Sequence, residues 1–276
     1  MQQKLFSSAV LVSLCGLILG NAHAADVPRF EPKVIVAPQI FTVPARSIDI
    51  LGISPGMTVD EVKALLSKAL PGGSFSEPSA SIQINFRGAN IRTTDFTNYL
   101  TDTRADNGTG NDETVFASFS GPASGNQNIG LRRQINYREV LRAPSVADVR
   151  QSLLAKYGQP SQLSSVNGSY YYLWSYSKGS FVTCTPMMIM TECRQNESQN
   201  YDIPQLSRYT GQWPADFVME ATINNQPQDP SKVGTFVIRY VAFTKRAVAA
   251  KADLESLLAE GSRIMALQPQ ASVPSL

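Results

Sequence analysis

Apolar residues recur at helical spacing directly behind Thr58. Thr58 is placed to cap a helix, and Glu61, three residues later, completes a capping box. Apolar positions on one face continue from Val59 to Ala69, and Pro71 with the two glycines after it ends the pattern. The sequence therefore predicts a first helix between Thr58 and Pro71.

A second stretch repeats this arrangement. Ser145 takes the capping position, Asp148 lies three residues later, and Gly158 ends the apolar pattern. The segments Thr58–Lys63 and Ser145–Arg150 align without a gap, which favours a duplicated helix-plus-sheet unit. Two unrelated, well-capped helices remain an alternative, because capping boxes are common.

Alternating or continuous apolar runs that follow each helix in the sequence predict strands. These are Ile82–Phe86, Val115–Phe119 and Ile129–Tyr137 after the first helix, and Tyr170–Tyr176, Ser180–Cys184, Val218–Ile223 and Phe236–Phe243 after the second. An alanine-rich stretch capped by Thr244 predicts a last helix to about Leu267. Because strands and helices do not alternate regularly, the expected class is α+β, with helices packed on antiparallel sheet.

The N-terminus has the order of a secretory signal. The basic residue Lys4 precedes an apolar run over Leu5–Leu19, and Ala22-His23-Ala24 supplies small residues at the exit. We expect cleavage after residue 24 and a periplasmic or secreted protein without a transmembrane helix. An uncleaved anchor is the first alternative, although the run is shorter than the ~20 residues that cross a bilayer. Lipid attachment at Cys15 is the second, although the residue before it, Leu14, is not small.

The predicted organisation follows from these elements. Residues 1–24 form the signal, residues 25–46 a proline-rich extended arm that adds at most an edge strand, and residues 268–276 a disordered tail. Two helix-plus-sheet units, 47–140 and 141–267, lie between the arm and the tail, and the second unit includes the C-terminal helix.

Both helix starts resemble those of a known group of envelope proteins. The segment Pro55-Gly56-Met57-Thr58-Val59-Asp60-Glu61-Val62 resembles the helix start of SmpA/OmlA-type proteins, small periplasmic modules related in fold to the β-lactamase inhibitor protein. Lys156-Tyr157-Gly158-Gln159-Pro160, followed by Trp174, resembles the helix, Gly-x-Pro and aromatic-strand layout of the same group. The resemblance covers two short segments and implies helices on an antiparallel sheet, binding through protein contacts, and no catalysis. The long insertion between the units, and Leu14 before Cys15 in place of a lipoprotein signal, depart from the group.

Composition narrows the chemistry. Hydrophobic residues make up 43% of the chain and charged residues 17%, and loss of Lys4 lowers the formal net charge from +2 to +1, so nothing marks the chain for nucleic acid. The single histidine, His23, leaves with the predicted signal. The mature chain then has no Ser-His-Asp or Cys-His arrangement and no conventional zinc site. We therefore expect a protein that is not an enzyme and binds no cofactor.

Two cysteines remain after the predicted cleavage, and an exported protein favours a disulfide between Cys184 and Cys193. Two buried free thiols are the alternative. The enclosed loop carries Met187, Met188 and Met190, whose flexible apolar side chains suit either an adaptable contact surface or the filling of core gaps.

The strand Tyr170–Tyr176 is the second candidate surface. Tyr170, Tyr172 and Trp174 share one face, because side chains alternate along a strand. One face of this strand is expected to receive the helices, and the other is a candidate recognition surface, since tyrosine and tryptophan are favoured at interfaces. Packing within the sheet explains the same pattern.

Acidic residues support two alternatives. The segment Asp102–Glu113 is rich in Asp, Asn and Gly, but it lacks the EF-hand ligand spacing, so we expect a flexible loop rather than a calcium site. A pair of carboxylates across a cleft would favour a hydrolase of envelope glycans. The preferred expectation is a protein-binding or assembly module of the cell envelope, with an envelope protein as its partner.

Overall fold

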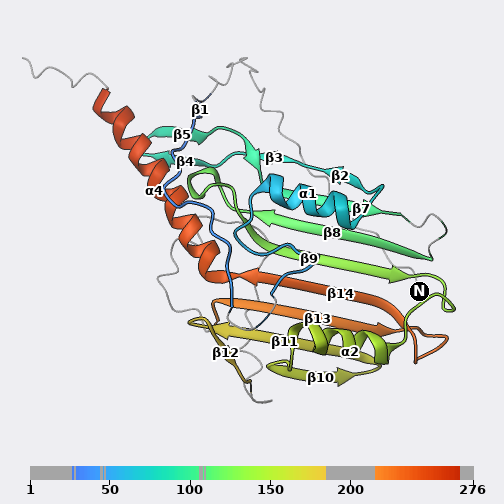
Figure 1. The fold of residues 1–276 in the computed structure, drawn as a ribbon. Helices are drawn as coiled ribbons and strands as arrows, with labels where there is room; N and C mark the ends of the chain where they lie inside the picture. Colours follow the sequence, from blue (N-terminus) through green and yellow to red (C-terminus); the bar gives the residue numbers. More distant parts are fainter. Residues whose placement is uncertain are drawn as a thin grey trace, which may run out of the picture.

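The computed structural model describes residues 27, 29–43, 46, 48–105, 108, 110–184 and 215–267. It confirms the predicted class, because helices pack on a large antiparallel sheet and a long helix ends the described chain (Figure 1). None of the described helices is long and apolar enough to cross a membrane.

One large sheet runs through the molecule, and every neighbouring pair in it is antiparallel. In spatial order its strands are β10 (Gln162–Val166), β11 (Ser169–Ser177), β13 (Phe217–Asn225), β14 (Val233–Ala242), β9 (Asn128–Tyr137), β8 (Asn111–Phe119), β7 (Tyr99–Arg104) and β2 (Ser74–Ser76), with β12 (Ser180–Val182) beside the end of β11.

Helices α1 (Val59–Ala69) and α2 (Val146–Tyr157) cover the same face of this sheet (Figure 1). Their buried side chains join every second side chain of the strands in one continuous apolar core. Val62 and Leu66 contribute from α1, and Leu153 and Tyr157 from α2. The opposite face of the sheet carries neither α1 nor α2, and only the first turn of the C-terminal helix reaches it; because α1 and α2 are absent from it, we call it the helix-free face.

A smaller layer lies beside the end of β8 and the start of β9 and is held by the C-terminal helix α4 (Phe243–Leu267) (Figure 1). It comprises β1 (Arg29–Phe30), β5 (Ala89–Thr93) and β4 (Gln83–Phe86) in one sheet, β3 (Ser79–Ala80) paired with β6 (Phe96–Thr97), and the 3₁₀-helix η1 (Pro122–Ser124). Asp253 of α4 accepts hydrogen bonds from the N–H groups of Gly121 (3.0 Å) and Ala123 (2.8 Å), which ties α4 to the start of η1.

The two halves of the large sheet have the same architecture. Each has a helix followed by four strands, which lie side by side in the sheet in the order in which the chain forms them. The first half comprises α1, β2, β7, β8 and β9, and the second comprises α2, β10, β11, β13 and β14. The N-cap residue Thr58 bridges to Gln127 immediately before β9, and the N-cap residue Ser145 bridges to Lys232 immediately before β14. The helix cap and the last strand therefore meet in the same way in both halves.

The last strands of the two halves pair with each other about a local two-fold axis. Counted from the bridged residues, Leu131 corresponds to Phe236, and Ile135 corresponds to Tyr240. The ladder pairs Ile135 with Phe236 and Leu131 with Tyr240. A two-fold rotation that exchanges β9 with β14 therefore turns each of these two pairs into the other. Each half also interrupts its last hairpin at the corresponding place, by register shifts at Ser118/Phe119 and at Asn224/Asn225.

The segment Asp102–Glu113 corrects an expectation. Instead of one flexible loop, its ends belong to β7 and β8, and Asp102 and Glu113 are both buried beneath the helices. The connection between the strands is confined to residues 105–110. Turn-forming residues in the middle of the segment concealed the strand residues at its ends.

Candidate binding surfaces

The hairpin β10–β11 forms one edge of the large sheet. Its turn is Asn167-Gly168, with φ of 50° and 76°, as a two-residue turn of the type favoured in hairpins requires. Among the described strands, β11 is the only partner of β10, so the outer side of β10 lies at the end of the sheet. This Asn-Gly pair is the sequence signal that would have predicted the hairpin.

The turn fixes which backbone groups of β10 point outward. A two-residue turn closes on a hydrogen-bonded pair, here Val166 with Ser169, and hydrogen-bonded pairs alternate with non-bonded ones along an antiparallel ladder. Leu163 and Ser165 therefore lie in the non-bonded pairs with β11. Their N–H and C=O groups point away from the sheet, where an added strand would bind.

Among the described residues, β10 itself carries no side-chain protection against an added strand. Natural edge strands are guarded by charged side chains, proline or bulges. From Tyr157 to Ser177 the chain has no charged residue, and β10 contains no proline. Apolar side chains are instead exposed, with 47% of Leu163, 56% of Val166 and 42% of Tyr171 accessible.

A hollow of about 410 Å³ lies beside this edge on the helix-free face. Val166, Tyr171 and Leu173 provide apolar lining, and Thr222 of the neighbouring β13 provides a hydroxyl. Glu220, the one acid among the residues that line it, accepts a hydrogen bond from Arg239 Nε at 2.6 Å. Every second side chain of a strand added to β10 would face this hollow.

The opposite edge of the sheet differs. The edge strand there, β2, spans only Ser74–Ser76, and Pro71 and Pro78 lie on either side of it. Short edge strands discourage further pairing. The prolines do not distinguish the two edges, because Pro160 likewise lies two residues before β10. The two halves thus share their topology, but only β10 presents a longer, uncharged edge.

The sequence-predicted contact face of β11 has to be revised. Tyr172 and Trp174 are 2% and 1% exposed, because their side of the strand receives α2. Tyr172 Oη accepts a hydrogen bond from Arg150 Nε (2.8 Å), and Trp174 Nε1 donates to the carbonyl oxygen of Gly158 (3.1 Å). Tyr170 on the same side is half-buried, and the Arg150 Cζ atom lies over its ring, 4.7 Å from the ring centroid. The exposed tyrosine is Tyr171, on the other side of the strand.

The remaining predicted contact residues, Met187, Met188 and Met190, lie outside the described residues, as does Cys193. Cys184 is buried beside Leu173, Val218 and Phe243 on the helix-free face. Its pairing with Cys193 stays a prediction.

The acidic residues of the segment Asp102–Glu113 form no metal cluster with other described residues. Glu113 accepts hydrogen bonds from Arg104 Nη2 (2.9 Å) and Arg133 Nε (2.6 Å). Neither carboxylate oxygen of Asp102 has a hydrogen-bond partner among the described residues. Burial raises the pKa of the Asp102 carboxyl, and the nearby negative charge of Glu113 raises this pKa further.

No protein family, curated protein or solved structure matches this chain.

Proposed function

We propose that the protein is an exported, non-enzymatic protein-binding or assembly module of the cell envelope, and that it binds an extended segment of a partner protein along β10. The observation that carries the proposal is the exposed, uncharged edge of β10, with outward backbone groups at Leu163 and Ser165. Addition of a strand to such an edge is a recurring mode of peptide recognition.

The hollow beside the edge supplies the specificity. Backbone hydrogen bonds to β10 would hold any extended segment, whereas Val166, Tyr171 and Leu173 favour one with apolar side chains at alternate positions. The hairpin has no charge, and Glu220 in the hollow is already paired with Arg239, so the edge favours no charged segment. The partner segment is therefore an uncharged strand with alternating apolar residues.

Hydrolysis of glycans finds no comparable support. It needs two carboxylates across a cleft, and Glu220 is the single acid among the residues lining this hollow. Asp102 and Glu113 approach each other, but both are buried under the helices and Glu113 is bound to two arginines.

Site-specific photo-cross-linking in intact producing cells tests the proposal. A photoreactive residue replaces Leu163 at the edge or, as a control, Lys251 on the exposed side of α4. We expect one abundant envelope protein to be captured from position 163 and not from position 251. Equal capture of the same proteins from both positions, or capture from neither, would overturn the proposal.

A further inference from the structure

A segment preceding α1 packs over the central strands β9 and β14 between the two helices, in a region that we call the valley (Figure 1). Ile48, Ile50 and Ile53 of this segment are buried in the main core. Ile50 and Ile53 pair through mutual backbone hydrogen bonds of 3.1 and 3.0 Å, and Leu51 and Gly52 form the turn between them. We call residues 50–53 the valley hairpin.

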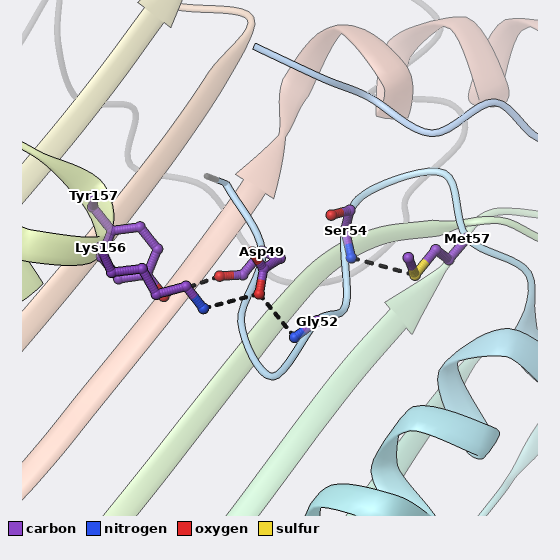
Figure 2. Close-up of polar contacts among 6 residues, drawn as sticks. All are labelled: Asp49, Gly52, Ser54, Met57, Lys156 and Tyr157. Atoms are coloured by element: carbon purple, nitrogen blue, oxygen red, sulfur yellow. Dashed lines mark hydrogen bonds and ion pairs between the residues drawn. The ribbon is translucent and has the colours of Figure 1, made fainter. Parts of the chain in front are cut away.

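Polar contacts fix the valley hairpin against α2. Asp49 Oδ1 accepts hydrogen bonds from Gly52 N (2.8 Å) and Lys156 Nζ (2.9 Å). Tyr157 Oη donates to the Asp49 carbonyl oxygen at 2.9 Å. Figure 2 shows Lys156 and Tyr157 reaching from α2 to the base of this turn, while Met57 Sδ accepts from Ser54 N on the side toward α1.

The valley hairpin occupies only part of the valley, and a groove of about 350 Å³ remains between it and α2. Its floor is apolar, made by Ile135 of β9 with Phe236 and Ile238 of β14. Val149 and Leu153 of α2 form one wall. This volume lies within the range of about 300–1,000 Å³ typical of small-ligand sites.

The charged residues that line this groove are both cations, Arg133 and Lys156. Glu113 holds Arg133 through Nε alone, and neither Nη group of Arg133 has a partner among the described residues. A guanidinium fixed at one nitrogen keeps two donors in a rigid fork suited to a carboxylate or phosphate.

We propose that the groove binds an amphipathic anion. Its apolar chain lies on the floor of Ile135, Phe236 and Ile238, and its carboxylate or phosphate accepts from the Nη groups of Arg133. Lys156, which is paired with Asp49, lies at the same groove. This site is separate from the β10 edge: the groove lies on the helix-covered face, and the hollow beside β10 lies on the helix-free face.

Isothermal titration of the purified protein with four twelve-carbon probes tests the proposal. Dodecanoate and dodecyl phosphate should bind at least about tenfold more tightly than dodecanol, as expected for charge-assisted hydrogen bonds, and dodecyltrimethylammonium should bind most weakly. The tighter of the two anions distinguishes a carboxylate from a phosphate source. Equal binding of all four probes, or binding of none, contradicts the proposal.

Two pairs of variants place the site. Arg133→Gln should weaken both anions about tenfold and leave dodecanol unchanged, whereas Arg132→Gln, on the opposite face of β9, should change neither. Ser152→Trp fills the groove from an exposed position of α2 and should abolish binding of every probe, while its neighbour Gln151→Trp should retain it. Unaltered binding to a folded Ser152→Trp protein overturns the assignment even if Arg133→Gln fails to fold.

Discussion

Arg133 of β9 pairs with Ile238 of β14 at the centre of the large sheet, and the two residues hold the same position in the two halves. One is a cation held by Glu113, and the other is part of the apolar core. The halves therefore share a backbone arrangement, while their side chains make the valley asymmetric. This asymmetry gives the groove both an apolar floor and a guanidinium.

Glu113 is expected to be a main polar support of this region. It is buried and binds both Arg104 and Arg133. Glu113→Gln leaves two partly buried guanidinium groups without their anion, so we expect a loss of about 2–3 kcal/mol in the free energy of unfolding, measured in urea. Glu255→Gln, which breaks an exposed pair with Lys251, should cost less than about 0.5 kcal/mol. Equal losses in the two variants would show that the Glu113 network contributes no more than a surface pair.

Asp102 is expected to destabilise the folded protein at neutral pH. Its carboxyl pKa is raised in the folded state by burial and by Glu113, so the folded protein binds this proton more tightly than the unfolded chain does. The favourable effect of protonating Asp102 on the folded state is fully present below pH 3.8, the ordinary pKa of this carboxyl. It is lost as the pH rises through the raised pKa of the folded state. Asp102→Asn, which mimics the protonated form, should stabilise the protein by about 1 kcal/mol at pH 7 and by nothing at pH 3.

Urea unfolding at several pH values checks this prediction. Asp229→Asn is the control, because hydrogen bonds from Ser231 lower the pKa of the exposed Asp229 carboxyl, and this variant should not gain stability at pH 7. An Asp102→Asn difference that stays the same from pH 3 to pH 7 would contradict the account of a buried, unpartnered carboxylate.

The two helix caps test whether the halves unfold together. Thr58 Oγ1 accepts from Glu61 N while Glu61 Oε2 accepts from Thr58 N, and Ser145 Oγ accepts from Asp148 N. Thr58→Ala and Ser145→Ala should each cost about 1 kcal/mol. Because β9 and β14 join the halves in one sheet, both variants should shift a single calorimetric transition. Two transitions, with each variant moving a different one, would show that the halves unfold independently.

The sequence predicted the helices well because their signals are local. The capping box of Thr58 and Glu61 is present, and the side chain of Ser145 caps α2 as expected. The C-terminal helix was also predicted, but the charged residues Arg246 and Asp253 on it are buried, which its alanine-rich sequence did not indicate. Asp253 accepts hydrogen bonds from the N–H groups of Gly121 and Ala123 at the start of η1, a role that depends on residues far away in the chain.

Strands whose faces depend on distant partners were predicted less well. The sequence did not predict β7, because Asp102 and Arg104 share its core-facing side with Leu100 and break the apolar alternation. The sequence did not predict β10 either, because its serines interrupt the alternation of apolar and polar residues that marks a strand. The aromatic strand β11 was predicted, but which of its faces receives α2 is decided by packing, so Tyr172 and Trp174 were candidates for a surface that Tyr171 occupies.

The proposed binding of a partner strand is tested most directly by a substitution at one outward N–H group. Ser165→Pro removes the N–H that points away from β11 without removing a hydrogen bond of the sheet, whereas Ser165→Thr keeps it. With the photoreactive residue at position 163 in both variants, the yield of the cross-linked partner in producing cells is measured beside the melting temperature of each protein. We expect the proline variant to lose at least about tenfold in yield with its melting temperature nearly unchanged, and the threonine variant to keep the yield. The same yield from both variants would show that β10 does not bind its partner through its backbone, and the central claim would be wrong.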